Sequence, residues 1–409
     1  MKRKVLFVAE ALTLAQVVRL LVLARGIDRE KYDVHFACRD FPELLFGDTD
    51  FERSPIYTID PDSGLSRVEK GERIYDVTTL TRYVESEREL FSRVRPDIVV
   101  GDFRLSLSVS ATLAKVPLLT LINAYWSPYA EREAFPVPDH PIVKLVGPER
   151  AARYIDRALP RAFAHFAAPL QQVQKKFGLP AHGDLQEQLC DGDYTLYPDV
   201  PELVPTRRLP ESHVYLGPVP WSPRVPLPDW WQGLDPTLPT VYVTLGSSGA
   251  AHVLPLVFEA LSSLQVNVLF ALAGRTGESF RGFEAIRSSA GRVFVADYLP
   301  GDEAARRSAF VISNGGASTS YQALGEGVPV LGIPYNLDQY LAMTAIEQAG
   351  AGILLRAGNL ALRPLQQACV RLLNSSELKR GALAVQRAFS AYDCHARFAG
   401  LLSKVNPTG

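Results

Sequence analysis

The sequence predicts an α/β protein with two Rossmann-like domains, each built on a doubly wound parallel sheet, that face each other across a cleft. Length is the first observation, because 409 residues are too many for one hydrophobic core and fit two domains of about 200 residues each. The second is that short apolar runs alternate with amphipathic stretches, as in sheets covered by helices on both faces. The third is a proline-rich stretch near the middle, after which this alternation starts again.

In the first half, continuous apolar runs predict strands that are buried on both faces. These runs are 5–9, 33–37, 97–101 and 118–122. Apolar residues at helical spacing predict one helix from Ala15 to Gly26 and another over 75–95, ending before Pro96. This order of strands and helices predicts a domain with a parallel sheet over residues 1–215.

The stretch 216–239 contains many prolines, which prevent regular structure, and predicts an extended linker between the domains. Beyond it, the alternation predicts a second domain over 240–384. Its predicted strands are 241–245, 266–272, 293–296, 310–313 and 328–333. Apolar periodicity also predicts one long amphipathic helix over about 376–403.

The composition is that of an ordinary globular protein, with 47% apolar and 21% charged residues. The formal net charge is −1 and no large charged block occurs, which argues against nucleic-acid partners and against anionic membrane surfaces. No apolar run reaches the length of about 18 residues that a transmembrane helix needs. Glu10 interrupts the apolar run at the start and no small-residue cleavage site follows, so this run predicts a first strand instead of a signal peptide.

The cysteines and acidic triplets predict neither disulfides nor a metal centre. The four cysteines are far apart, form no C-x-x-C pair and favour the reducing cytoplasm. Three Asp-x-Asp triplets, at 48–50, 60–62 and 191–193, do not follow a strand end that faces the loops described below, so no metal ion is expected. Neither G-x-G-x-x-G nor a P-loop motif is present, which argues against a nicotinamide enzyme and a P-loop ATPase.

Ligands of doubly wound sheets bind beyond the carboxyl ends of the strands, and the loop after 310–313 has the residues of a binding site. Gly315 and Gly316 allow a sharp bend and a close approach of the backbone to a ligand. Ser318 and Thr319 follow at the first turn of a predicted helix, where free N–H groups and the helix dipole favour an anion. The alternative is that these residues only cap the helix after a tight turn.

Three further groups follow strands at the same predicted edge. Ser247 and Ser248 occupy another strand-to-helix turn and, with the previous loop, predict a diphosphate site, although alone they can form only a turn. Asp338 and Gln339 follow the next strand, where a carboxylate and an amide can bind neighbouring hydroxyls of a sugar. Their alternative is an acidic first helical turn. Tyr298 can stack on a nucleotide base or lie in the core.

The order of these motifs resembles a known family. The stretches "VYVTLGSS", "DYLPG", "NGGASTSYQALGEGVP" and the P-x-x-x-D-Q pattern together look like the nucleotide-sugar site of GT-B glycosyltransferases, in particular the UDP-sugar and macrolide (antibiotic) branch. The resemblance is strong over most of 240–350 and extends to the layout of the rest. It implies that the donor binds the second domain and the acceptor the first, and that the helix at 385–409 packs back on the first domain.

The same resemblance implies roles for individual residues. Ser247, Ser318 and Thr319 would hold the diphosphate, Tyr298 would lie near the base, and Asp338 and Gln339 would bind the donor sugar. Two positions depart from the family, because Asn314 stands where it usually has His and Gln322 where it usually has a ribose-binding Glu. Both departures remove an ionisable group, which leaves neutral hydrogen bonds but puts the usual preference for UDP in doubt.

The general base of the family is a His in a Gly-His-Val-x-Pro motif, oriented by an Asp at the end of a later strand. Matching this motif places Ala15, Gln16 and Arg19 at its Gly, His and Pro positions. Asp102 is the counterpart of the Asp, although it can also be a helix N-cap. A primary amide cannot take up a proton at neutral pH, so Gln16 leaves the identity of the base open.

Three explanations for Gln16 stay open. Asp102 or Glu10, both at carboxyl ends of strands, can act as the base if burial raises its pKa. The acceptor can instead be a phenol or carboxylate, which needs little help, or the protein can bind a sugar nucleotide without efficient turnover. His140 lies in a proline-rich loop and either reaches the cleft or lies on the surface.

We therefore expect a glycosyltransferase that moves a sugar from a UDP- or dTDP-sugar to a hydroxyl of a small, largely apolar acceptor, such as a natural product or lipid. The reaction is expected to be inverting and to need neither metal nor any cofactor besides the nucleotide-sugar co-substrate. The aromatic stretch 123–147 can line an acceptor pocket or pack as a loop over the sheet. The alternatives are a catalytically impaired sugar-nucleotide-binding or partner protein, and a nucleotide-sugar epimerase or hydrolase on the same fold.

Overall fold

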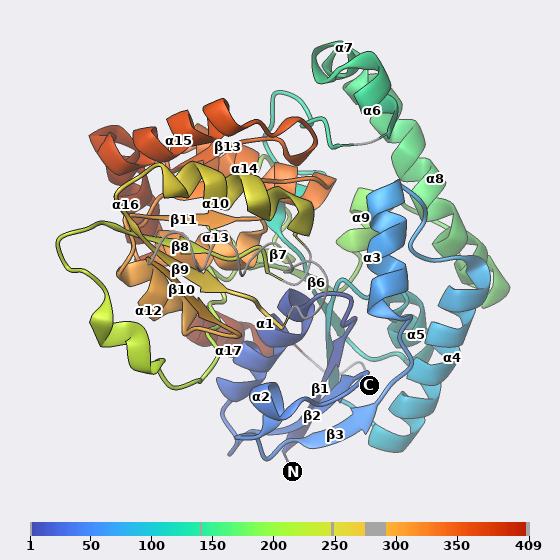
Figure 1. Ribbon diagram of the computed structural model, residues 1–409. Helices are drawn as coiled ribbons and strands as arrows, with labels where there is room; N and C mark the ends of the chain where they lie inside the picture. The colour runs from blue at the N-terminus through green and yellow to red at the C-terminus, as the bar shows by residue number, and fades with distance from the viewer. Residues whose placement is uncertain (1, 140, 247–248, 275–291, 406–409) are drawn as a thin grey trace. The chain divides into compact units, whose positions relative to one another are not determined.

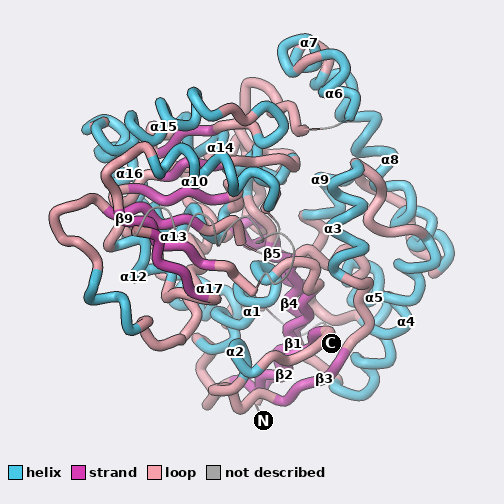
Figure 2. Tube along the Cα trace, in the orientation of Figure 1, coloured by secondary structure: helices cyan, strands magenta, loops and turns pink. Residues whose placement is uncertain are grey.

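The computed structural model describes residues 2–139, 141–246, 249–274 and 292–405. The chain forms two compact units, each assembled from separate stretches. Unit 1 consists of Met1–Phe135, Ala152–Val219 and Tyr392–Gly409, and unit 2 of Pro136–Ala151 and Pro220–Ala391. Each unit contains one sheet whose strands all pair in parallel, and Figure 2 shows these strands in magenta. The predicted fold class, two parallel-sheet Rossmann-like domains, is therefore confirmed for the two units.

The sheet of unit 1 has seven strands in the order β3-β2-β1-β4-β5-β6-β7. They are β1 (Arg3–Ala9), β2 (Tyr32–Cys38), β3 (Glu52–Pro55), β4 (Ile98–Asp102), β5 (Leu118–Leu121), β6 (Tyr194–Tyr197) and β7 (His213–Tyr215). The central strands β1 and β4 carry continuous apolar residues that are completely buried, as a parallel sheet covered on both faces requires. Their carboxyl ends are in register, with Ala9 paired to Asp102.

The helices of unit 1 begin and end at recognisable signals. They are α1 (Leu14–Arg25), α2 (Glu43–Phe46), α3 (Pro61–Lys70), α4 (Val77–Val94), α5 (Leu107–Ala114), α8 (Ile155–Lys176), α9 (Leu185–Leu189) and α17 (Cys394–Leu402), with the 3₁₀ turn η1 (Ala124–Trp126). The Asp76 carboxylate accepts the Thr79 N–H and so caps α4, and Arg95 ends that helix in the left-handed region before Pro96. In Figure 1, α4 and α8 lie side by side, as do α1 and α17.

The sheet of unit 2 has six strands in the order β10-β9-β8-β11-β12-β13. They are β8 (Thr240–Val243), β9 (Asn267–Ala271), β10 (Val293–Ala296), β11 (Phe310–Ser313), β12 (Val330–Gly332) and β13 (Gly352–Leu354). Its helices are α6 (Pro141–Val146), α10 (Leu254–Ser262), α12 (Gly301–Arg306), α13 (Ala317–Gly325), α14 (Leu337–Gln348), α15 (Leu362–Asn374) and α16 (Ser376–Ser390), with 3₁₀ turns η2 (Asp229–Gly233), η3 (Ala251–Val253) and η5 (Ala357–Asn359). Helix α7 (Pro148–Ala152) crosses the boundary between the two units.

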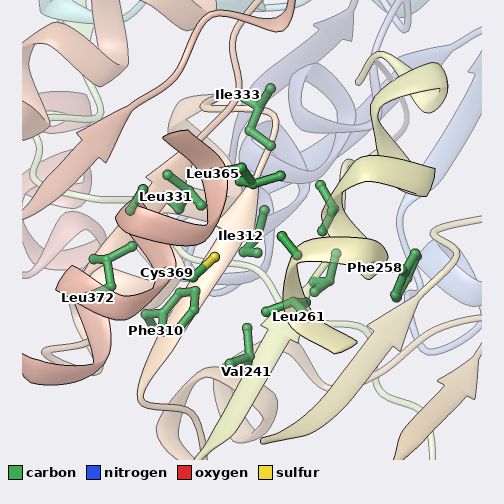
Figure 3. Close-up of a cluster of buried hydrophobic side chains, with 14 of the residues drawn as sticks. Val241, Phe258, Leu261, Phe310, Ile312, Leu331, Ile333, Leu365, Cys369 and Leu372 are labelled. Carbon is green, nitrogen blue, oxygen red and sulfur yellow. The ribbon is translucent and has the colours of Figure 1, made fainter. Parts of the chain in front are cut away.

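One face of the unit 2 sheet is covered by α10 and α15. Phe258 of α10, Leu365 of α15 and Ile312 of β11 belong to one buried cluster, and Figure 3 shows Leu365 next to Ile312. All three side chains are at most 2% exposed, and burying each stabilises the unit by about 1.5–3 kcal/mol. This core holds β8, β11 and β12 in place, and the predicted donor-binding loops follow these strands.

The predicted single helix over 376–403 is wrong, because the structure has two helices there. Helix α16 ends at Ser390, and Asp393 caps α17 by accepting the N–H groups of His395 and Ala396. The apolar periodicity continues across this break, but the Asp393 side chain satisfies a new helix start. The break also falls where the chain passes from unit 2 back to unit 1. Among the helices that the structure describes, none combines the length and the apolar character needed to cross a bilayer.

Candidate functional site

The loops that carry the predicted donor-binding residues leave the unit 2 sheet at its carboxyl edge. Strands β8, β11 and β12 are consecutive neighbours, so the turns after them lie side by side at the edge where doubly wound sheets bind ligands. The described residues of these turns are 244–246 with 249–250, 314–319 and 334–339. Tyr298 follows β10, which is separated from β8 by one strand.

The turn between β11 and α13 requires its first glycine. Gly315 has a φ of 79°, a left-handed conformation that glycine adopts without strain. A Cβ at this position would lie 2.6 Å from Cγ of Met343. The N–H of Gly315 donates to Oγ of Ser313 and that of Gly316 to Oδ1 of Asn314, both at 3.0 Å. The Asn314 side chain therefore shapes this turn.

The first turn of α13 presents the groups that an anion site needs. Ser318 is exposed and Thr319 is half-buried, and the first N–H groups of a helix have no partner within the helix. The helix dipole adds partial positive charge at this end. Ser320 is different, because it is completely buried and its Oγ lies 3.3 Å from Oγ of Ser313.

The turn after β8 packs against the same loop. Gly246 has a φ of 58°, and a Cβ on Gly249 would come within 3.0 Å of Cβ of Asn314. The β8 and β11 turns therefore touch at the edge of the sheet. The predicted residues Ser247, Ser248 and His140 lie outside the described residues.

The loop after β12 is held by hydrogen bonds among its own residues. Asn336 caps α14, its Oδ1 accepting the Gln339 N–H at 3.0 Å. The Gln339 Oε1 accepts the backbone N–H of Tyr335 at 3.1 Å, and the Gln339 side chain is 2% exposed. Asp338 is half-buried in the first turn of the same helix. One carboxylate and one amide thus stand at the head of α14.

Two further predicted residues have specific neighbours. A Cβ on Gly274 would lie 2.5 Å from the Tyr298 hydroxyl, so the chain after β9 passes directly over this phenol. The Gln322 Nε2 donates to the backbone carbonyl of Trp221 at 2.9 Å. A glutamate at position 322 could not donate this hydrogen bond, so the departure from the resembled pattern fits the local structure.

In unit 1, two predicted carboxylates lie at the carboxyl ends of adjacent strands. Asp102 ends β4 opposite Ala9 of β1, and Glu10 follows Ala9 directly. Both carboxyl side chains are completely buried. The next residues, Ala11 and Phe103, have φ values of 62° and 55°, which are strained for residues other than glycine and are found preferentially at functional sites.

Asp102 forms a bidentate ion pair with Arg19 of α1. The Arg19 Nε lies 2.9 Å from Oδ2 and NH2 lies 2.7 Å from Oδ1. The Arg19 NH1 also donates to Asn123 Oδ1 at 2.6 Å. Asn123 in turn donates to Asp199, which also accepts the Ala124 N–H. A buried polar network therefore surrounds the carboxylate that the sequence assigned to orienting a base.

Glu10 belongs to a second buried cluster. Its Oε1 accepts the hydroxyls of Tyr75 at 2.8 Å and Tyr83 at 2.7 Å, and Arg104 lies 3.4 Å from its Oε2. Burial raises the pKa of the Glu10 carboxyl to about 7, against the lowering effect of Arg104. Arg104 also pairs with Glu87 at 2.6 Å, so one cation is shared by two carboxyl groups.

Gln16 stabilises the start of helix α1. Its Oε1 accepts the backbone N–H groups of Leu12 at 2.9 Å and Thr13 at 3.1 Å, and the side chain is 7% exposed. This is half of a capping box, in which the third helical residue reaches back to the cap. The carbonyl end of this side chain is therefore engaged in local structure.

The sequence analysis gave no functional role to several residues that the structure places beside the predicted ones, although it named Arg19 at the Pro position of the motif. Arg19, Asn123, Asp199, Tyr75, Tyr83 and Arg104 are all buried or nearly so. One signal was available, because Arg19 is a lone cation in the apolar stretch "VVRLLVLA" and a buried cation needs an anionic partner. Among the described residues, no group of three or more His, Cys, Asp and Glu side chains is arranged to hold a metal ion.

Two parallel-sheet units with a glycine turn and a helix head at the sheet edge have the architecture of the GT-B fold. The C-terminal domain model described as "Erythromycin biosynthesis protein CIII-like" matches residues 257–403. A Mycobacterium tuberculosis "PGL/p-HBAD biosynthesis glycosyltransferase" is 45% identical over 389 residues, which is 95% of this chain and 89% of that protein. A Mycobacterium bovis "PGL/p-HBAD biosynthesis rhamnosyltransferase" is 44% identical, covering 95% of this chain and 84% of that protein. The chain belongs to the glycosyltransferase family of these mycobacterial proteins and is itself a glycosyltransferase.

Further comparisons concern the fold and a relative that is named inactive. The structure of the glycosyltransferase of kitacinnamycin has a TM-score of 0.71 at 17% identity, covering 99% of this chain and 100% of that one. Glycosyltransferase VinC, solved with dTDP, has a TM-score of 0.68 at 17% identity, covering 98% of each chain. An "Inactive PGL/p-HBAD biosynthesis glycosyltransferase" from Mycobacterium bovis is 46% identical over 261 residues, 64% of this chain and 71% of that protein.

Proposed function

We propose that the protein transfers a sugar from a UDP- or dTDP-sugar to an acidic hydroxyl of a largely apolar acceptor, with inversion and without a metal ion. Unit 2 would bind the donor and unit 1 the acceptor. The observation that carries the donor assignment is the turn at Gly315 and Gly316, which leads into a helix head with Ser318 and Thr319 at its first turn. This arrangement suits a diphosphate.

The name of one relative and the ligand of one similar structure support a particular class of donor. The name of one relative describes a rhamnosyltransferase, and VinC was solved with dTDP. The Gln322 amide is engaged by Trp221, so a tight requirement for both ribose hydroxyls is not expected from this side chain. We therefore rank a dTDP-sugar, and a rhamnosyl group in particular, first among the donors.

We infer an acidic acceptor because each of the three candidate bases is engaged by other groups or cannot take up a proton. Transfer breaks the bond between the anomeric carbon and the diphosphate, which leaves as the nucleoside diphosphate, while the acceptor oxygen attacks from the opposite side and releases its proton to water. Asp102 is paired with Arg19, Glu10 is enclosed by two tyrosines, and the Gln16 amide cannot accept a proton. General base catalysis is worth roughly 10²–10⁴ in rate, and a phenol or carboxylic acid has the least need of it.

An acceptor series tests this proposal. The protein is incubated with dTDP-rhamnose, dTDP-glucose or UDP-glucose and with apolar phenols, carboxylic acids and aliphatic alcohols of similar size, and the released nucleoside diphosphate is measured. We expect release with the phenols and acids and little with the alcohols. Equal rates with alcohols would show that an efficient base is present and would overturn the acidic-acceptor proposal.

A second candidate function has its own support. The carbonyl of Gln16 caps α1, both candidate carboxyl groups are buried, and one relative is named inactive. These observations favour a protein that binds a sugar nucleotide with little transfer. Tight binding of a nucleotide sugar in a calorimeter, with no nucleoside diphosphate released by any acceptor in the series, would identify this function.

A further inference from the structure

A short segment from the first half of the sequence contacts the donor-sugar loop of unit 2. Residues 136–151 belong to unit 2, although strands of unit 1 precede and follow them in the sequence. Within this segment, the backbone N–H of Asp139 donates to the carbonyl of Tyr335 at 3.1 Å. Tyr335 opens the loop that carries Asp338 and Gln339, so the contact falls on the part of unit 2 that the proposed function gives to the sugar.

Both oxygens of the Asp139 carboxylate accept hydrogen bonds. Its Oδ1 lies 2.6 Å from NH2 of Arg356, and its Oδ2 accepts the Gly358 N–H at 2.8 Å. The side chain of Asp139 is 9% exposed and that of Arg356 is 22% exposed. Charge-assisted hydrogen bonds in such partly dry surroundings are stronger than neutral ones. A Cβ on Gly358 would come within 3.0 Å of the carboxyl carbon, so the backbone there lies directly against Asp139.

Arg356 connects this carboxylate to the rest of the loop. Its NH1 donates to the Val137 carbonyl at 2.7 Å, and its guanidinium lies 4.7 Å from the centre of the Tyr340 ring. The following residue, Ala357, donates its N–H to the carbonyl of Pro334 at 3.1 Å. The loop that begins after β12 is therefore held on its outer side by Val137–Asp139 and by the chain after β13.

The contacts reach Gln339 through the backbone of a single residue, Tyr335. The Tyr335 carbonyl accepts from Asp139, and the Tyr335 N–H donates to Oε1 of Gln339. Fixing the Tyr335 backbone therefore fixes the Gln339 side chain, whose Oε1 accepts the Tyr335 N–H. A displacement of about 1 Å in such a group can cost on the order of 10²-fold in rate.

From these contacts we infer that Asp139, which is held in place by its ion pair with Arg356, is a positioning residue for the donor sugar. It touches no reacting atom. It holds the Tyr335 backbone and, through it, the amide that would bind the sugar, so that recognition of the sugar depends on a segment outside the C-terminal nucleotide-binding half of the sequence. This inference rests on the proposed function, in which the loop at Asp338 and Gln339 binds the donor sugar.

The test separates recognition of the sugar from recognition of the nucleotide. Titration calorimetry measures binding of dTDP-rhamnose and dTDP, and of UDP-glucose and UDP, to the wild-type protein and to Asp139→Asn. The variant keeps the side chain's shape but loses the charge that binds Arg356. We expect affinity for the nucleotide sugar to fall about tenfold or more, because a charge-assisted contact is lost, while affinity for the nucleoside diphosphate changes less than about twofold. In turnover, the donor KM should rise with a smaller change in kcat.

Two further variants keep the test conclusive. Arg356→Lys retains a positive charge but loses the planar fork whose separate nitrogens reach Val137 and Asp139, and it should show the same selective loss to a smaller extent. Glu326→Gln makes the same chemical change in another Arg–carboxylate pair of unit 2, with Arg306 at 2.9 and 3.0 Å, and should leave both affinities unchanged. Thermal unfolding confirms that each variant is folded.

The outcomes distinguish the inference from the proposed function. If the wild-type protein binds none of the four compounds, the proposed function fails. If it binds them and Asp139→Asn loses nucleotide and nucleotide-sugar affinity equally, or loses neither, the inference about Asp139 is overturned while the proposed function stands. If Asp139→Asn does not fold, the selective loss in Arg356→Lys decides the matter in the same way.

Discussion

Arg19 and Asp102 face each other inside unit 1 with two parallel hydrogen bonds, from Nε to Oδ2 at 2.9 Å and from NH2 to Oδ1 at 2.7 Å. Asp102 is completely buried and Arg19 is 9% exposed. In the resembled family this carboxylate would orient a histidine, whereas here it is balanced by a guanidinium one turn along α1 from Gln16. This relationship explains how a chain without the histidine keeps a buried aspartate at the end of β4.

Replacing Arg19 by Met should destabilise unit 1 strongly. The substitution removes the cation that balances a completely buried carboxylate, and breaking such a pair costs about 3–5 kcal/mol. The free energy of unfolding, measured with urea, should therefore fall by this amount. The double variant Arg19→Met with Asp102→Leu should be less destabilised than the single one, because no buried charge is left. If the double variant loses as much unfolding free energy as the two single variants added together, the two side chains do not stabilise each other and the prediction is wrong.

Replacing Gln16 by His should raise the rate of transfer to aliphatic alcohols. A histidine supplies a group that accepts the hydroxyl proton near neutral pH, and the gain should approach roughly 10²–10⁴. Gln16→Ala is the control, since it removes the oxygen that accepts the Leu12 and Thr13 N–H groups, costs about 1 kcal/mol and should bring no gain. A folded Gln16→His protein without faster turnover would mean that something other than a base limits the reaction.

Glu10 should make the stability of the protein fall as the pH rises towards 8. Its pKa is about 7 in the folded protein, raised from 4.5 by burial, so the folded state holds the proton more tightly than the unfolded state. The contribution is fully present below about pH 4.5 and is lost as the pH rises through about 7, amounting to on the order of 3 kcal/mol. Glu10→Gln stays neutral and should lack this drop. Urea unfolding at pH 5 and pH 8 checks it, and curves that shift equally in both proteins would contradict it.

Replacing Gly315 by Ala should weaken both stability and donor binding. The φ of 79° is strained for alanine, and its Cβ would press on Cγ of Met343 at 2.6 Å, which together cost about 1–3 kcal/mol. The matched control is Gly325→Ala on the same helix, where a Cβ would meet nothing within 4 Å. Thermal unfolding and the donor KM should be affected by the first substitution and not by the second. Equal behaviour of the two variants would remove the turn from the donor site.

The central strands could be predicted from the sequence because they are buried on both faces. The runs at 5–9 and 97–101 fall within or beside β1 and β4. The missed strands include β3 and β13, which lie at the outer ends of their sheets. Strand β3 reads "ERSP" and β13 has three residues, so neither gives an apolar run that differs from a loop.

The candidate site could be predicted only as far as single loops. Glycine and hydroxyl residues after a strand can be recognised locally, and Asn314 to Thr319 lie where the pattern places them. Partners far apart in the sequence cannot be recognised in this way. Arg19 and Asp102 are separated by 83 positions and Asp139 and Arg356 by 217, and only the sheet topology brings each pair together.

Helix α17 has a consequence for how the protein is made. Phe398 packs against Phe7 with ring centres 6.1 Å apart, and Arg3 donates to the carbonyl of Val405 at 2.6 Å. Helix α17, which completes the core of unit 1, is therefore synthesised only after all of unit 2 has left the ribosome. Until α17 has been synthesised, the apolar surface that it covers on β1 and α1 stays exposed. We therefore expect chaperones to bind, and proteases to degrade, chains that end before Cys394.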